Sequence, residues 1–261
     1  MNIRSVSFDL FDTLIDFDFS LLPIVEIEGG SERTTSKVAY DRLYNEGFEL
    51  PTFFAFHVVW QEISKMVWEE REKDVENREI SSIDRFRRFS SRFLNLKEEE
   101  REKMAKISME AHMETLLSAT VFDNSRLLLL EKIKESGLLL GLLSNFDHSK
   151  GAISILEKTR ILPFLDVCII SEDEGYRKPR GSVFISLSDK LNLQPSEILF
   201  VGDTFEADVI GSKGVGMQSV WLNKGKKVSA IIRSFLKIKC PINNAAKNLN
   251  KFFKKNKINL V

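Results

Sequence analysis

The chain has 261 residues, 38 Lys and Arg against 38 Asp and Glu, and 43% hydrophobic residues. This length allows one large domain or two modest ones, with enough apolar residues for a sizeable core. Cys168 and Cys240 are far apart and match no metal-ligand spacing, so we expect a reduced, cytoplasmic protein. The start of the chain does not resemble a signal peptide. The longest apolar region, 127–146, contains four charged residues, and we expect no membrane span.

Charge is unevenly distributed although the net charge is zero. Residues 16–120 carry 22 acidic and 15 basic residues, whereas residues 224–261 carry 11 basic residues and none that is acidic. A basic segment attracts polyanions, but this one lacks a nucleic-acid motif and any aromatic–basic alternation. We expect weak binding to nucleic acid or anionic lipid at low salt and no specific nucleic-acid partner. The sequence leaves the oligomeric state open.

The first half of the chain predicts one strand followed by helices. Residues 3–8, "IRSVSF", predict a strand that ends at Asp9. From about residue 31 to residue 117 the pattern predicts four charged helices and no strand, which indicates a helical insert. Ser31 is the expected N-cap of the first of these helices, and Gly47 is its expected end. The four stretches are 31–48, 51–72, 81–96 and 97–117.

After residue 119 the pattern alternates between strands and helices. Helices are expected within 125–137, 150–161, 181–193 and 206–214, and strands within 138–144, 165–171, 197–203 and 218–223. Apolar strands separated by helices predict a parallel sheet covered on both faces. The expected fold class is therefore α/β, a doubly wound parallel sheet with an inserted all-helical domain. We expect residues 1–15 and 119–261 to form the core domain and residues 16–118 to form the insert.

Four motifs gather at the carboxyl ends of the predicted strands, where such sheets bind ligands. They are "DLFDTL" (9–14), "LLSN" (142–145), "YRKP" (176–179) and "GDTFEAD" (202–208). In this order, with a helical insert after the first, they resemble the haloacid dehalogenase (HAD) superfamily, whose members are mostly phosphohydrolases. The resemblance covers nearly the whole chain. It implies a Rossmann-like core and a helical cap between the first and second motifs.

Phosphoryl transfer explains why these residue types occur together. It needs a nucleophile and positive charge around the phosphoryl oxygens. Asp9 is the expected nucleophile, through an aspartyl phosphate, and Lys178 is the expected fixed positive charge. Ser144, Asn145 and Thr13 are expected to contact the substrate, and Ser144 to donate a hydrogen bond to a phosphoryl oxygen.

A Mg²⁺ ion would lie between the nucleophile and the anionic substrate and act as a Lewis acid. Asp9 and Asp203 are the expected carboxylate ligands. The resemblance adds the backbone carbonyl of Phe11, and it implies that Asp208 is a more distant or water-mediated ligand.

Phe11 departs from the family pattern, because phosphatases of this superfamily have an aspartate there as general acid and base. Asp12 follows, but on a strand-like path it would point away from the leaving group, and we interpret it as a turn-stabilising residue. Asp16, Asp18 and His57 are weaker candidates for a replacement acid. Without an acid, substrates with good leaving groups, such as acyl or aryl phosphates, are favoured.

Three functions remain open at this point. We favour a Mg²⁺-dependent phosphatase, weakened by Phe11, that acts on a small phosphorylated metabolite. A metal-independent 2-haloacid dehalogenase is the second reading, since such enzymes also carry an aromatic residue at this place. It would need a cap arginine for the substrate carboxylate, for which Arg33 and Arg42 are candidates. A non-catalytic binding or regulatory protein is the third reading.

Overall fold

The structure is a computed structural model that describes residues 3–27 and 29–222. A five-stranded sheet lies at its centre in the order β7–β6–β1–β8–β9, and all neighbouring strands are parallel. The first strand is central, and the chain adds two strands on each side of it. The strands are β1 (Ser5–Phe8), β6 (Leu139–Ser144), β7 (Val167–Ile170), β8 (Ile198–Gly202) and β9 (Gln218–Trp221).

Helices follow the strands in the predicted alternation, and hydrophobic clusters cover both faces of the sheet. One cluster packs Phe8 of β1 against Leu130 of α5 and Leu156 of α6. The other packs Phe200 of β8 against Phe184 of α8. The expected α/β class is confirmed. The elements are α5 (Ser125–Glu135), α6 (Ser149–Lys158), η2 (Leu162–Phe164), α7 (Ser171–Glu174), α8 (Gly181–Leu191), η3 (Pro195–Glu197), the π-helix η4 (Phe205–Ile210) and α9 (Gly211–Gly214).

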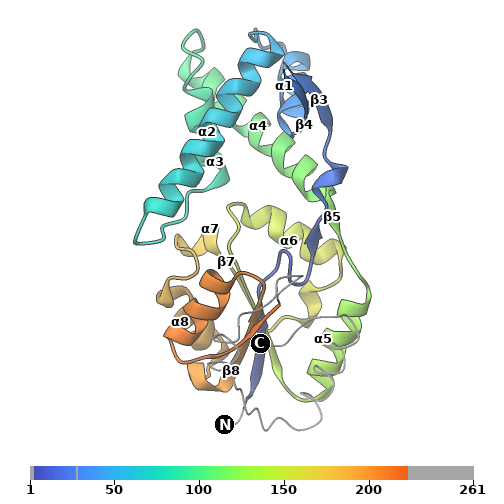
Figure 1. The fold of residues 1–261 in the computed structure, drawn as a ribbon, viewed down its shortest axis with the longest axis vertical. Coiled ribbons are helices and arrows are strands. Elements are labelled where there is room, and N and C mark those ends of the chain that lie inside the picture. Colours follow the sequence, from blue (N-terminus) through green and yellow to red (C-terminus); the bar gives the residue numbers. More distant parts are fainter. Residues whose placement is uncertain (1–2, 28, 223–261) are drawn as a thin grey trace.

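Among the described residues, four α-helices lie between β1 and α5 along the chain, as the sequence predicted. They are α1 (Ser36–Asn45), α2 (Phe53–Lys73), α3 (Ser82–Ser90) and α4 (Glu98–Ser118). They share a hydrophobic cluster of their own around Phe56, Trp60 and Phe89. In Figure 1 these helices stand above the sheet. The chain enters and leaves this part through β2 (Asp16–Phe17) and β5 (Thr120–Val121), which pair antiparallel.

The expectation that this part contains no strand is wrong. A hairpin of β3 (Ile24–Ile27) and β4 (Gly30–Arg33) precedes α1 and follows the short helix η1 (Phe19–Leu21). Ser31 therefore lies in a strand, and the first helix begins at Ser36. The sequence signal was the β-branched run "IVEI" followed closely by two glycines. Gly29 and Gly30 adopt φ of 99° and 149° at the turn.

Two further predictions concerned the basic C-terminal segment and the absence of a membrane span. The basic segment 224–261 and Cys240 lie outside the described residues. Within the described residues, no helix combines the length and the apolar character needed to cross a membrane.

Candidate active site

Three predicted site residues lie at the carboxyl edge of the sheet because their strands are neighbours. The backbone N–H of Asp9, directly after β1, donates to the carbonyl of Val201 in β8 at 2.9 Å. This pairing brings Asp9 beside the end of β8, where Asp203 follows. Ser144 ends β6 on the other side of β1. The predicted convergence of these strand ends is thus present in the structure.

Lys178 connects two of the carboxylates. Its Nζ lies 2.7 Å from Oδ1 of Asp9 and 2.7 Å from Oδ1 of Asp208. The lysine side chain is only 1% exposed. Burial opposes its charged form, but the charges of Asp208 and Asp9 raise the pKa of Lys178 above its ordinary value. The lysine is therefore a fixed cation beside the proposed nucleophile.

Asn145 holds the backbone of the lysine. Its Nδ2 donates to the carbonyl of Lys178 at 2.9 Å, and its Oδ1 accepts from the Lys178 N–H at 2.8 Å. Asn145 was expected to contact the substrate. The structure shows its side-chain amide hydrogen-bonded to the Lys178 backbone, and Asn145 also lines the cavity, so its contact with the substrate remains a prediction.

Asp208 is buried where Gly202 leaves room for it. A Cβ on Gly202 would lie 2.3 Å from the Asp208 carboxyl group, so any larger residue would collide with this carboxylate. The Oδ2 of Asp208 accepts from the backbone N–H of Thr204 at 2.9 Å, and its Oδ1 accepts from Lys178. Both oxygens already have protein donors. The expectation that Asp208 is a more distant or water-mediated metal ligand remains a prediction.

The acidic cluster has the composition of a cation site. One carboxylate oxygen from each of Asp9, Asp203 and Asp208 lies within 4.8 Å of the others. Burial raises the pKa of Asp9 to about 7 even though Lys178 opposes this shift. Burial, and then the charges of Asp208 and Asp12, raise the pKa of Asp203. The single positive charge of Lys178 does not balance the three carboxylates of Asp9, Asp203 and Asp208. A hard divalent cation, which prefers oxygen ligands, would supply the missing positive charge. The expected Phe11 carbonyl ligand remains a prediction.

Ser144 has the properties expected of a phosphate-binding residue. It is buried, it lines the cavity beside Asp9, and its Oγ has no hydrogen-bond partner among the described residues. A buried hydroxyl without a partner is costly unless a ligand or water satisfies it. Thr13 is also buried with an unpartnered hydroxyl, but it is not among the residues that line this cavity.

The cavity that contains these residues measures about 560 Å³ and has a second wall that the sequence did not indicate. The end of α2 contributes Trp68, Arg71 and Glu72, and the loop after it contributes Asn77. Arg177, next to Lys178, completes this wall. In the sequence Trp68, Arg71 and Glu72 resemble an ordinary charged helix surface, and only the tertiary packing brings them to the cavity that contains Asp9.

The residues at the place of the missing acid adopt a bent path. Phe11 stacks on Phe17 with a centroid distance of 4.6 Å and also packs on Phe146 at 4.7 Å. Asp12 has φ of 58°, a left-handed conformation, so the strand-like path that we expected does not hold at this residue. Asp12 lines the cavity, and its charge helps to raise the pKa of Asp203.

The other candidates for a replacement acid or a carboxylate anchor lie elsewhere. Asp16 pairs with Arg126, and Asp18 caps η1 by accepting from Ser20 N–H. His57 is buried in the helical part and hydrogen-bonded to Ser36 at 2.8 Å. Arg33 donates to the carbonyl of Leu22, and Arg42 pairs with Glu114. None of these five candidates (Asp16, Asp18, His57, Arg33 and Arg42) lines the cavity.

Comparison with known proteins agrees with this geometry. Residues 3–216 match the family model of haloacid dehalogenase-like hydrolases, and the chain belongs to this family of hydrolases. The expected family membership is confirmed.

Two curated relatives are phosphatases by name. Glyceraldehyde 3-phosphate phosphatase of Pyrococcus furiosus is 32% identical over 95 residues, which is 36% of this chain and 39% of the relative. N-acylneuraminate-9-phosphatase of Mus musculus is 34% identical over 107 residues, 41% of this chain and 42% of the relative. The matched part thus spans about two fifths of the length of each relative.

The structural likeness covers more of the chain. The 2-haloacid dehalogenase of Pseudomonas syringae pv. Tomato superposes with a TM-score of 0.62 at 20% identity, over 87% of this chain and 90% of that one. At this identity the likeness concerns the fold alone.

Proposed function

We propose that this protein is a Mg²⁺-dependent phosphohydrolase that acts on a small phosphorylated metabolite through an aspartyl-phosphate intermediate. The observation that carries the proposal is the buried contact of Lys178 with Asp9, at 2.7 Å, inside a cluster of three carboxylates. This arrangement combines a nucleophile, a fixed cation and a place for a divalent metal. The names of the two curated relatives support a phosphatase.

The first step of the proposed reaction belongs to Asp9. A carboxylate oxygen of Asp9 forms a bond to phosphorus as the bond between phosphorus and the leaving-group oxygen breaks. Lys178 and the Ser144 hydroxyl would bind phosphoryl oxygens and stabilise the charge that spreads over them. Asp9 and Asp203 would hold Mg²⁺, which when bound neutralises part of the negative charge shared by nucleophile and substrate.

The second step releases phosphate and restores the enzyme. A water molecule attacks phosphorus, the bond between phosphorus and the Asp9 oxygen breaks, and the carboxylate is regenerated. The water oxygen stays on the released phosphate, and its protons leave with the phosphate or pass to solvent. Splitting one difficult displacement into two easier ones is the general advantage of a covalent intermediate.

Phe11 restricts the leaving groups that this site can expel. The ring is packed between Phe17 and Phe146 and can donate no proton. General acid catalysis contributes roughly 10²–10⁴-fold in rate. The proposed substrates are therefore esters or anhydrides whose leaving group departs readily as an anion, such as aryl or acyl phosphates.

The helical part between the two connections would serve as a cap. Residues 16–118 carry their own hydrophobic cluster, and the end of α2 supplies part of the cavity wall. A movement at β2 and β5 would open the cavity to substrate and close it to water during the reaction. In this proposal residues 1–15 and 119–261 form the catalytic core domain.

The test is hydrolysis of p-nitrophenyl phosphate by the purified protein in Mg²⁺ and in excess EDTA. We expect turnover with Mg²⁺ and its loss in EDTA. Turnover that persists in EDTA would reject the metal requirement. Chloride release from 2-chloropropionate without metal would instead favour the dehalogenase reading, and inactivity on both substrates would favour a binding protein.

A further inference from the structure

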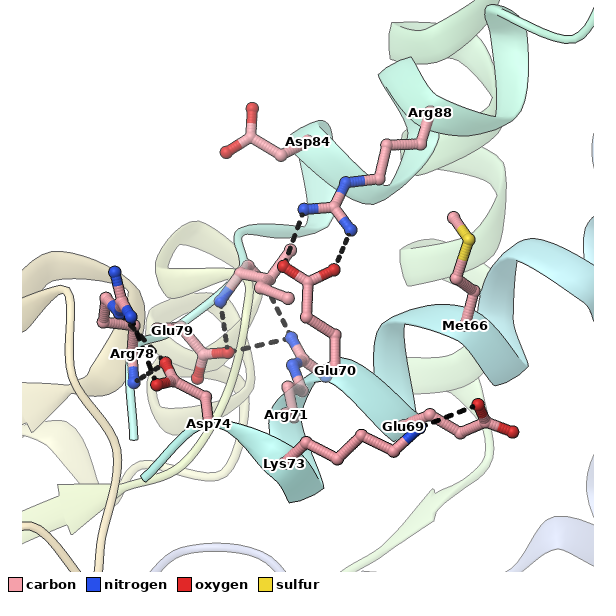
Figure 2. Close-up of a pocket in the computed structure, with 11 residues that line it drawn as sticks. Met66, Glu69, Glu70, Arg71, Lys73, Asp74, Arg78, Glu79, Asp84 and Arg88 are labelled. Carbon is pink, nitrogen blue, oxygen red and sulfur yellow. Dashed lines mark hydrogen bonds and ion pairs between the residues drawn. The ribbon is translucent and has the colours of Figure 1, made fainter. Parts of the chain in front are cut away.

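A second group of charges borders the cavity that contains the carboxylates. Arg71, on the last turn of α2, is 6% exposed at its side chain. Its Nη2 lies 2.8 Å from Glu79 and 3.0 Å from Asp147. Figure 2 shows the guanidinium of Arg71 turned toward Glu79. The Nε of Arg71 is buried without a hydrogen-bond partner among the described residues, although Arg71 lines the cavity.

Arg177 borders the same cavity from the core side. Its Nε lies 3.7 Å from Glu79, farther than a hydrogen bond reaches, and its side chain is 18% exposed. Glu79 already accepts from Ser171 and pairs with Arg71. Ser171 and Arg71 therefore already occupy the carboxylate of Glu79. Arg177, which lines the cavity, still has guanidinium N–H groups that can donate to a ligand there.

The buried charges around Glu79 do not balance. Arg71, Arg177 and Arg85 face two carboxylates, those of Glu79 and Asp147. The group thus has an excess of one positive charge. Burial lowers the pKa of both Arg85 and Arg177, which is the effect expected of cations with too little compensation. Glu72 and Glu206 also line the cavity, but both are exposed and their charges are screened by water.

Trp68 adds a flat surface at this wall. Its ring centroid lies 5.2 Å from the Arg71 guanidinium carbon and 5.8 Å from that of Arg177, and the residue is 52% exposed. Contact with an aromatic face restricts the orientation of a guanidinium. The two arginines are therefore held in place before any substrate arrives.

We propose that Arg71 and Arg177 bind a carboxylate of the substrate, at the opposite end from the phosphoryl group that Asp9 attacks. A guanidinium binds a planar carboxylate through two parallel hydrogen bonds, and a single negative charge matches the excess of one positive charge. A cavity of about 560 Å³ accommodates a small metabolite of this kind. The inference rests on the proposed function and narrows its substrate class to phosphate esters that carry a carboxylate.

The test compares 4-carboxyphenyl phosphate with phenyl phosphate, whose leaving groups are similar. With Mg²⁺, the wild-type protein should show at least about tenfold higher kcat/KM for the carboxylated ester, which corresponds to one charge-assisted contact. Arg177→Gln should remove most of this preference. Arg88→Gln is the matched control and should retain the preference, because Arg88 pairs with Glu70 (Figure 2) and neither residue lines the cavity that contains Asp9.

A binding measurement separates this inference from the proposed function. Calorimetry with Asp9→Asn and Mg²⁺ should show tighter binding of 4-carboxyphenyl phosphate than of phenyl phosphate, and the difference should vanish in Asp9→Asn/Arg177→Gln. If wild type hydrolyses neither ester but this difference is present, the phosphatase proposal fails and the carboxylate site stands. Equal affinities, or a preference that survives Arg177→Gln, would overturn the carboxylate site.

Discussion

The side chain of Asn145 and the backbone of Lys178 form two hydrogen bonds, of 2.9 and 2.8 Å, that join the loop after β6 to the loop before α8. The amide uses its donor and its acceptor on the two backbone groups of the same residue. Lys178 is thereby placed so that its Nζ reaches Asp9 and Asp208. The position of the central cation depends on a residue from a different strand end.

Asn145→Ala should lower kcat by about 10–100-fold while the protein stays folded. Losing both hydrogen bonds allows Lys178 to move, and small displacements of catalytic groups cost rates of this order. Steady-state kinetics on p-nitrophenyl phosphate with Mg²⁺ provide the measurement. Asn145→Asp, which can accept but not donate, should give an intermediate kcat. Wild-type kcat in folded Asn145→Ala would show that the contact does not position the lysine.

Lys178→Met should destabilise the protein as well as abolish activity. It leaves the carboxylates of Asp9 and Asp208 buried without their cation, a change that typically costs about 3–5 kcal/mol. The loss should be largest at pH 8 and smaller at pH 6, because the raised pKa of Asp9, about 7, allows this carboxyl to protonate. Urea unfolding without metal at the two pH values measures this.

Lys190→Met is the control for that experiment. Lys190 pairs with Glu174 at the surface with a side chain 51% exposed, and exposed pairs contribute about 0–1 kcal/mol. A stability loss in Lys178→Met no greater than in Lys190→Met would contradict the assigned role of Lys178 in charge balance.

His112 should make the helical part sensitive to acid. It packs on Trp60 and Phe86 and is hydrogen-bonded to Thr35 at 2.7 Å. Burial, and then the charge of Arg85, lower its pKa well below 6.5. The unfolded chain therefore binds a proton near pH 6.5 that the folded protein does not, and stability falls as the pH drops below 6.5, by at most about 1.4 kcal/mol per pH unit.

His112→Gln should flatten the dependence of unfolding free energy on pH between 6.5 and 5 relative to wild type. Chemical unfolding at several pH values in this range gives the comparison. If the unfolding free energies of the two proteins changed with pH by the same amount, His112 would titrate alike in the folded and unfolded states, which would contradict this prediction.

Asp12 allows a test of whether the bent loop supplies a proton. If Asp12 only supports its turn, Asp12→Gly should retain turnover, since glycine adopts the φ of 58° readily. Asp12→Ala should lose about 1 kcal/mol of stability, because alanine is strained in this region. We expect both results, because we interpret Asp12 as a residue that supports its turn. A selective loss of activity on alkyl phosphates in both variants, with p-nitrophenyl phosphate unaffected, would identify Asp12 as the acid.

The parts of the site that lie within short motifs could be predicted from the sequence. Ser144 ends β6, and Asp9 and Asp203 directly follow β1 and β8. These strands are recognisable from their apolar runs, and parallel strands bring their ends to one edge. The β3–β4 hairpin was missed although Gly29 and Gly30 marked its turn, because the charged residues around it were interpreted as part of the helical pattern.

The second wall of the cavity could not be predicted. Arg71 lies in "WEEREK", which alone is typical of a solvated helix end. Its burial depends on Glu79 from the following loop and on Asp147 from the core, and such long-range pairing leaves no local period in the sequence. The contact of Asn145 with Lys178 could not be predicted for a similar reason, since the two residues are 33 positions apart in the sequence.

The most direct test of the central claim is to look for the phosphoryl group on Asp9. Wild-type protein is mixed with p-nitrophenyl phosphate and Mg²⁺, quenched in acid during turnover, and its peptides are analysed by mass spectrometry. We predict the added mass of one phosphoryl group on the peptide that contains Asp9, and neither that mass nor turnover in Asp9→Asn. A phosphoryl group found on another residue, or turnover that persists in Asp9→Asn, would contradict the assignment of Asp9 as the nucleophile.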